Sequence, residues 1–235
     1  MNFANAFTPE KLTEAWEIVL RDFPLAIWDT LYVTILSTLF SILIGLPLGM
    51  ILVACDEKGI RPWPKPVMKF VNVVINFLRS VPFLILIVMV IPITRLIVGT
   101  SVGTVASIVP LVIAAFPFVA RLVEGSLREV SPNIIEMAQS IGATPLQILF
   151  RIMLPESVPS LLHNFTLAIT TIMGYTAMSG AIGGGGIGKI AIMIGYNRYK
   201  YAVLYAAVVV LVLLVQLFQS LGTWMAIKSD KRLRH

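Results

Sequence analysis

The feature that most constrains this chain is a set of long stretches without a single charged residue. One lies between Asp29 and Asp56, and others cover residues 96–120, 157–188 and 201–227. Each is long enough to cross about 30 Å of hydrocarbon, which takes roughly 20 helical residues. Charged residues make up only 13% of the 235 residues, about half the share in soluble domains. We therefore expect an all-α, multi-pass membrane protein.

The spacing of charged residues divides the chain into three regions. Residues 1–24 predict an extracytoplasmic or interfacial segment, residues 25–227 a transmembrane domain, and residues 228–235 a basic cytoplasmic tail. Within the domain we expect a large loop over 121–156 and five membrane-spanning helices. These spans are predicted at about 30–55, 70–94, 96–120, 157–182 and 201–227.

The distribution of Lys and Arg predicts the orientation. If the loop at 121–156 is cytoplasmic, eleven of the 18 Lys and Arg residues are cytoplasmic and six are outside, while Arg79 is intramembrane. Because cytoplasmic loops carry the excess of positive charge, the N-terminus is expected outside and the C-terminus inside. The net charge of +6 is explained by topology, so we expect no nucleic-acid partner.

The loop contains the signals of a first short helix. Ser131 can serve as its N-cap, and Pro132 suits the first helical position. Gly142 is placed to end the helix in a left-handed conformation. One apolar face is predicted, because three side chains recur at i, i+4 and i+7: Ile134, Ala138 and Ile141.

A second short helix is expected directly after the first. Thr144 followed three residues later by Gln147 is the capping-box pattern, and the helix should run toward Pro155. Two short helices with an apolar face, on a polar loop between membrane spans, favour docking against another protein.

The same stretch resembles the EAA loop of ABC importer permeases, which has the pattern Glu-Ala-Ala, three residues, Gly, nine residues, Ile-x-Leu-Pro. The matching positions are Glu136, Met137, Ala138, Gly142, Ile152, Leu154 and Pro155. Met137 stands where Ala is usual, and Met is also a good helix former. The resemblance implies that residues 136–142 form a coupling helix in a groove on an ATPase. It also implies that Pro155 stops the second loop helix.

Resemblance extends over roughly residues 28–222. Segments 77–83, 91–100 and 174–178 look like those of methionine-uptake permeases of bacterial ABC importers. That family implies a homodimeric permease in the bacterial inner membrane, with methionine as substrate. Its implied partners are a cytoplasmic ATPase dimer, a periplasmic or lipid-anchored binding protein, and membrane lipid. No cofactor is implied, and the chain itself is not an enzyme.

In this family pattern, Met178 looks like the pore-narrowing position, with Tyr175 about one turn away. The residues themselves favour the same interpretation, because Gly174 and neighbouring small residues leave Met178 as a bulky, flexible plug. Ordinary packing is the alternative for Met178, since methionine routinely fills gaps in cores.

Arg79 interrupts the second predicted span and shares a helix face with Asn72 and Asn76. Such a polar stripe should face the helix bundle or a watery cavity. Two interpretations stay open. Arg79 either snorkels or pairs with a loop carboxylate, or it lines the cytoplasmic vestibule of a translocation pathway.

Two sequence features resemble a nucleotide-binding loop and a proton-relay residue, but their surroundings do not support either role. Residues 183–188 with Lys189 match the P-loop spacing, but Ile190 replaces the Ser or Thr that holds magnesium and a membrane helix precedes them. These glycines more plausibly permit a sharp turn or a close subunit approach. His163 lacks the ionisable companions of a proton relay, apart from Glu156, so a hydrogen-bonding role is expected.

Other transporter classes fit less well. An importer for another amino acid or small solute would share the same loop. An ion-coupled secondary transporter should carry intramembrane carboxylates and an internal repeat, which this sequence lacks. A membrane scaffold or channel subunit would not need the EAA-type loop pattern. Because we find no catalytic arrangement, ATP hydrolysis is assigned to a separate polypeptide.

Overall fold

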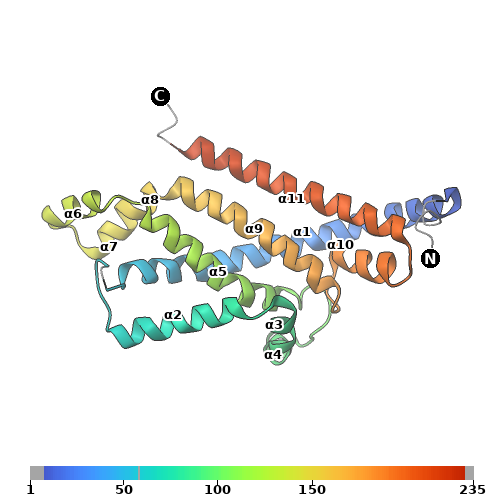
Figure 1. The fold of residues 1–235 in the computed structure, drawn as a ribbon, viewed down its shortest axis with the longest axis horizontal. Helices are drawn as coiled ribbons and strands as arrows, with labels where there is room; N and C mark the ends of the chain where they lie inside the picture. The colour runs from blue at the N-terminus through green and yellow to red at the C-terminus, as the bar shows by residue number, and fades with distance from the viewer. Residues whose placement is uncertain (1–7, 58, 231–235) are drawn as a thin grey trace. The chain divides into compact units, whose positions relative to one another are not determined.

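A computed structural model describes residues 8–57 and 59–230 and contains only helices and turns over these residues (Figure 1). The helices are α1 Pro9–Ala54, α2 Lys65–Ser80, α3 Phe83–Met89, α4 Ile91–Val98, α5 Ile108–Arg128, α6 Pro132–Ser140, α7 Pro145–Ile148, the π-helical η2 Leu149–Met153, α8 Leu154–Glu156, α9 Val158–Gly180, α10 Gly186–Lys189, the π-helical η3 Ile190–Tyr196, and α11 Tyr201–Ser229. Residues 1–7 of the predicted N-terminal segment, residues 231–235 of the predicted tail, and residue 58 lie outside the described residues.

α1 is one unbroken helix of 46 residues, where the sequence predicts an interfacial segment followed by a separate span. At 1.5 Å per residue it is about 69 Å long, more than twice the hydrocarbon thickness. Phe23 and Ala26 are buried against Ile187 and Val203 on either side of Pro24. This packing explains how the helix continues past a proline that removes one backbone donor.

The predicted second span is interrupted. α2 ends at Ser80, Val81 takes an extended conformation with ψ 124°, and α3 begins only at Phe83. Pro82 explains the break, because its ring disfavours the helical conformation of the residue before it. The structure therefore has α2, α3 and α4 where the sequence suggests one helix over 70–94.

α5 also differs from the predicted third span at 96–120. α4 ends at Val98, its C-cap Gly99 has φ 82°, and non-helical bends and turns occupy 99–107 before α5 starts at Ile108. α5 then continues through Pro117 to Arg128, beyond the predicted end. The last two turns of this helix consequently carry charged residues that sequence reasoning places in the loop.

Among the described residues, length and apolar composition identify three helices that could cross a membrane: α1, α5 and α11. The pair α2 and α3 gives a fourth candidate if it counts as one span across the break. α9 has 23 residues, enough in length, but it contains His163, Asn164 and several threonines that lower its hydropathy. Only 17% of the most apolar stretch of α11 is buried, which indicates a helix that faces lipid.

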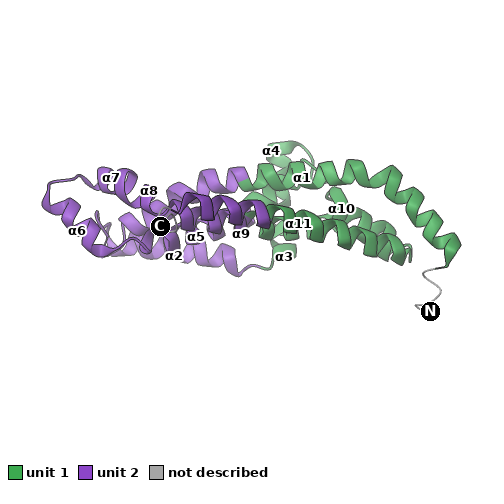
Figure 2. Cartoon of the chain, turned by 90° about the horizontal axis from the view of Figure 1, so that it is seen from above, with its two compact units in different colours: residues 1–38, 82–112, 169–218 green, residues 39–81, 113–168, 219–235 purple. Residues whose placement is uncertain are grey.

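The chain forms two compact units, residues 1–38, 82–112 and 169–218, and residues 39–81, 113–168 and 219–235 (Figure 2). In the first unit, the N-terminal part of α1 packs against α10, η3 and the start of α11. In the second, the C-terminal part of α1, α5 and the start of α9 share a core with the loop helices. This second core fixes the loop to the membrane helices that it follows.

Candidate functional site

The first loop helix, α6, begins and ends at the predicted residues. Ser131 occupies the N-cap position and Pro132 the first turn, as predicted, although the Ser131 side chain makes no capping hydrogen bond. Gly142 has φ 79°, and its N–H donates to Gln139 O at 2.9 Å. Ala143 N–H donates to Ala138 O at 3.0 Å. The two bonds form a Schellman motif, which confirms Gly142 as the helix stop.

The second loop helix starts with the predicted capping box. Gln147 N–H donates to Thr144 Oγ1 at 3.4 Å, and Thr144 N–H donates to Gln147 Oε1 at 2.9 Å. The helix continues from α7 through the π-helical turn of η2 into α8, and it ends at Glu156, one residue after Pro155. The sequence gives no sign of this π-helical turn.

The buried side of α6 differs from the predicted one. Ala138 is 1% exposed and belongs to the same core as Ile148 and Met153, and Ile135 packs against this core. Ile141 is instead 81% exposed, so it does not share the buried face. The helix ends directly at Ile141, and the following glycine turns the chain, which removes Ile141 from the helical register.

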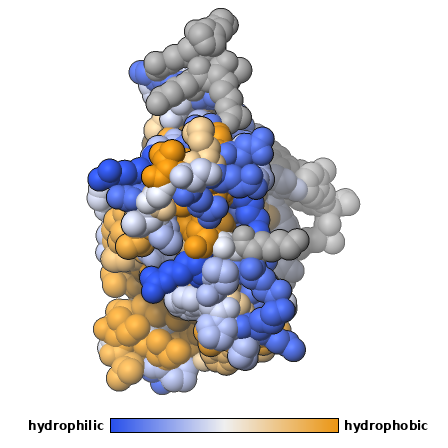
Figure 3. Space-filling model, turned by 90° about the vertical axis from the view of Figure 1, so that its left-hand side faces the viewer, coloured by the Kyte–Doolittle hydropathy of each residue, from blue (hydrophilic) through white to orange (hydrophobic). Residues whose placement is uncertain are grey.

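The loop presents an exposed apolar set, which we call the loop apolar set. Its members are more than half exposed: Met137, Ile141, Leu146 and Phe150. Figure 3 shows the face of the molecule that carries α6 and α7, where hydrophilic residues lie among apolar ones. Exposed apolar side chains within a polar surface mark a site for a protein partner.

The EAA-type residues divide into two groups in the structure. Glu136 and Met137 are exposed and available to a partner. Pro155 is also exposed, at the far end of the loop. The remaining positions shape the loop, because Ala138 is buried, Gly142 makes the turn, and two residues pack against the core: Ile152 and Leu154.

Glu136 also lines a cavity of about 480 Å³ beneath α6. Gln139 shares this cavity with an ion pair in which Arg128 Nη2 lies 2.8 Å from Asp56 Oδ2. Arg128 therefore ties the end of α5 to the residues that follow α1, directly below the predicted coupling helix.

The Asp56–Arg128 pair continues along α5 as a polar network. Arg128 Nη2 lies 2.9 Å from Glu124 Oε1, and Arg121 Nη1 lies 2.6 Å from Glu124 Oε2. Arg121 Nη2 donates to Asn72 Oδ1 at 2.6 Å and Asn76 Oδ1 at 3.1 Å. The polar stripe on α2 thus has Arg121 as its partner, which sequence reasoning missed. The signal was present as charges at i, i+3 and i+7 on one helix.

Arg79 does not join this network. Its side chain is exposed at the end of α2 and makes no ion pair with residues 8–57 or 59–230. Arg79 therefore lies on the same helix as Asn72 and Asn76 but does not share their hydrogen bonds to Arg121.

The predicted gate residues occupy two sides of α9. Gly174 and Met178 are exposed and one helical turn apart, and a Cβ built at Gly174 would meet nothing within 4 Å. Tyr175 instead stacks on Phe83, with ring centroids 4.5 Å apart and an interplanar angle of 11°. Gly180 packs closely on the backbone of residues 188–189, so it serves helix packing rather than the exposed face.

The glycine run turns the chain between α9 and α10. Gly183 and Gly186 have φ of 97° and 79°, and Gly103 N–H donates to Gly183 O at 2.8 Å. Ile187 N–H donates to the buried Thr30 Oγ1 at 2.9 Å. The run follows a helix rather than a strand, which supports a turn and not a P-loop.

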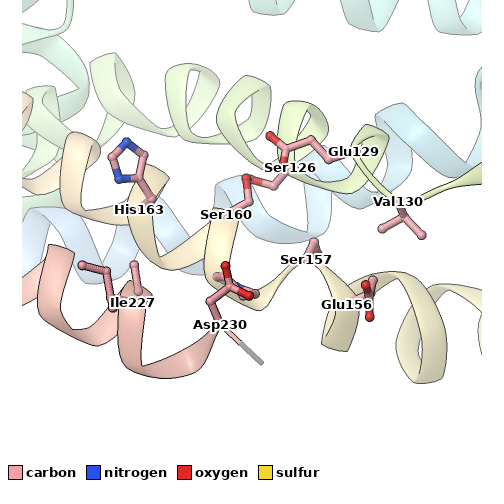
Figure 4. A pocket seen from close by; sticks show the side chains of 11 residues that line it. Ser126, Glu129, Val130, Glu156, Ser157, Ser160, His163, Ile227 and Asp230 are labelled. Carbon is pink, nitrogen blue, oxygen red and sulfur yellow. The ribbon is translucent and has the colours of Figure 1, made fainter. Parts of the chain in front are cut away.

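His163 lies in a second cavity, of about 360 Å³ (Figure 4). Ser160 Oγ donates to Ser126 Oγ at 3.1 Å, and Asn164 Nδ2 donates to the same oxygen at 2.8 Å. Besides the predicted Glu156, the cavity is lined by Glu129 and Asp230, which the sequence places far apart. Within the described part of the chain, no group of His, Cys, Asp and Glu has the geometry to hold a metal ion.

Comparison with known proteins finds that this chain is similar to membrane components of transport systems. Residues 45–235 match the family described as binding-protein-dependent transport system inner membrane component. The probable D-methionine transport system permease protein MetI of Vibrio cholerae serotype O1 is 45% identical over 207 residues, 88% of this chain and 92% of that protein. The corresponding protein of Pasteurella multocida is 44% identical over 217 residues, 92% and 98% of the two chains.

Solved structures show the same fold. A chain of the inward-facing MetNI methionine ABC transporter is 41% identical, with a TM-score of 0.85 over 88% of this chain and 95% of that one. A chain of an amino acid ABC transporter crystallised with histidines is 19% identical, with a TM-score of 0.76 over 94% and 100%. The second similarity supports the fold alone.

Proposed function

Because the chain belongs to the family of binding-protein-dependent transport system inner membrane components, we propose that it is the permease subunit of an ATP-driven methionine importer. The observation that carries this proposal is the combination of 45% identity to a D-methionine permease with a TM-score of 0.85 to a MetNI chain. In this account the chain forms the membrane pathway, and ATP hydrolysis lies on a separate ATPase subunit.

The coupling surface is the exposed side of the loop. Glu136 and the loop apolar set contact the ATPase, and the Schellman turn at Gly142 holds the α6 and α7 helices in position for docking. The core that α6 and α7 share with α1 and α5 supports this role, and the Asp56–Arg128 pair joins the ends of those two membrane helices in the cavity that Glu136 also lines. Movement of a docked α6 would then be transmitted to α1 and α5.

The chain crosses the membrane five times, with the N-terminus outside and the C-terminus in the cytoplasm. α9 is the fourth of these spans in chain order, since its 23 residues reach about 35 Å. Its polar side chains are partly satisfied within the protein, as Asn164 bonds to Ser126 on α5, which reduces their cost in a membrane. The excess of Lys and Arg on the loop side supports the orientation.

Two copies of the chain enclose the pathway in this account. The exposed face of α9 carries Gly174 and Met178, and Tyr175 holds that face in place by stacking on Phe83. Arg79, exposed at the end of α2, lines the translocation pathway. A periplasmic or lipid-anchored binding protein delivers methionine, and ATP-driven movement of the loops opens the pathway alternately to each side.

Isolation of the complex tests the proposal. The chain is co-expressed with an ATPase subunit and a methionine-binding protein of the same importer type, and ATP hydrolysis by the purified complex is measured in lipid nanodiscs. Binding protein loaded with methionine should raise the hydrolysis rate. A complex that lacks an ATPase subunit, or one that responds only to binding protein loaded with another solute, would contradict the proposal.

A further inference from the structure

A third cavity, which we call the outer pocket, has a volume of about 400 Å³ and lies wholly within the first compact unit. Its walls come from the N-terminal half of α1, the 103–104 turn, the glycine run, and the α10 and η3 segment. This volume falls in the range of about 300–1,000 Å³ that is typical of small-molecule sites. In the proposed orientation the pocket opens on the extracytoplasmic side.

Charged side chains of both signs line the outer pocket. Arg21 Nε lies 2.9 Å from Asp22 Oδ1, so these two lining residues neutralise each other. Lys189 and Arg198 also line the pocket, and neither forms an ion pair with another described residue. The half-buried Asp29 accepts a hydrogen bond from Thr104 Oγ1 at 3.2 Å and forms no ion pair within the same residues.

The backbone around Asp29 is held closely in place. A Cβ on Gly185 would collide with Thr104 Oγ1 and lie 3.2 Å from Asp29 Oδ2, so only glycine permits this approach. One residue later Gly186 has φ 79°, and Ile187 N–H is fixed by its bond to Thr30. The carboxylate of Asp29 therefore faces a rigid wall, which favours ligand binding over a mobile surface charge.

The apolar part of the lining can contact an apolar ligand side chain. It is formed by Leu25, Ala26, Ile190, Met193 and Ile194. A carboxylate, two cations and an apolar wall around one cavity match the three parts of an amino acid with an apolar side chain. A purely anionic ligand would place its charge near the half-buried Asp29, and a purely cationic one would place its charge near the exposed Lys189 and Arg198, so both would meet like charge in the pocket.

We infer that the outer pocket is an entry subsite that binds zwitterionic methionine before translocation. Lys189 and Arg198 bind its carboxylate, Asp29 binds its ammonium group, and the apolar wall contacts its thioether side chain. The inference rests on the proposed function, since the choice of methionine among apolar amino acids comes from there.

Ligand chemistry tests the pocket group by group. Saturation-transfer NMR is recorded on the permease–ATPase complex in nanodiscs, without binding protein, with methionine, methioninamide and N-acetylmethionine. Lys189→Gln should weaken methionine binding at least about tenfold and leave methioninamide, which lacks the carboxylate, unchanged. Asp29→Asn should weaken methionine to a similar degree and leave N-acetylmethionine, which lacks the ammonium group, unchanged.

Controls separate a binding role from a structural one. Asn at position 29 still offers an oxygen to Thr104, so the wall is retained, and Lys11→Gln alters an exposed lysine that does not line the pocket. Equal losses for all three ligands, or no loss in either variant, would overturn the inference. A signal from glycerophosphoethanolamine in place of methionine would also overturn it and identify a lipid-headgroup site.

Methionine uptake by the wild-type complex distinguishes failure of the entry subsite from failure of the proposed function. If binding protein and ATP drive methionine uptake but the pocket variants bind methionine normally, the subsite is wrong and the proposed function stands. If the wild type takes up no methionine, the proposed function fails and the subsite fails with it.

Discussion

Arg121 and Glu124 lie one turn apart on α5, with Nη1 of the arginine 2.6 Å from Oε2 of the glutamate. Their side chains are 21% and 14% exposed, whereas the next cation of the network, Arg128, is 48% exposed. The network therefore has a less exposed end, at Arg121 and Glu124, and a more exposed end, at Arg128 and Asp56. The two ends should differ in what they contribute.

Arg121→Gln should destabilise the protein by about 1–3 kcal/mol, because Glu124 loses one cation and Asn72 and Asn76 lose their common donor. Arg128→Gln removes a more exposed pair and should cost roughly 0.2–1 kcal/mol. Equilibrium unfolding of both variants in mixed micelles measures the difference. An Arg128→Gln variant that loses as much stability as Arg121→Gln would show that burial does not govern this network.

Gly142→Ala should destabilise the loop by about 1–2 kcal/mol, because φ is 79° at this position and L-residues resist that conformation. Gly174→Ala is the matched control, since its Cβ meets nothing within 4 Å and alanine favours a helix. Thermal unfolding of the two variants should shift in opposite directions. Equal destabilisation by both would argue against the turn at Gly142 as the cause.

Glu136→Lys should weaken association with the ATPase by roughly tenfold, through reversal of an exposed charge on the docking helix. Membrane insertion should be unchanged, since the side chain lies on the surface. Glu10→Lys makes the same charge reversal on an exposed residue of α1, far from the loop in sequence. Retention of the ATPase on the immobilised variants measures association, and normal retention with Glu136→Lys would refute the docking role.

Met178→Ala should raise the passive leak of methionine from loaded proteoliposomes several-fold, because a bulky side chain on the exposed face of α9 is removed. Met225→Ala truncates another exposed methionine, on α11, and should leave the leak unchanged. If the two variants leak equally, Met178 is an ordinary surface or packing residue.

Local signals in the sequence predicted local structure well. Gly142 ends α6 and Thr144 caps α7, because each depends on bonds within a few residues of itself. Ile141 was assigned to the wrong face, since helical spacing holds only while the helix continues and this one ends there. The break at Val81 was missed because apolar composition outweighed the backbone effect of Pro82.

Contacts between side chains far apart in the sequence could not be predicted from the sequence. Arg121 and Asn72 are 49 residues apart, and nothing in either segment specifies the pairing until the helices pack. The same holds for Asp29 and Thr104, which are 75 residues apart and meet only because a glycine run brings its backbone against them. The loop caps follow from local residue patterns, whereas the breaks between helices and the contents of each cavity depend on the backbone and on tertiary structure.

Uptake of labelled methionine into proteoliposomes that contain this chain, its ATPase and its binding protein tests the central claim most directly. The account predicts uptake that requires ATP and is abolished by excess unlabelled methionine. An intact complex that hydrolyses ATP, yet accumulates no methionine or accumulates it equally without ATP, would contradict the assignment as a methionine importer permease.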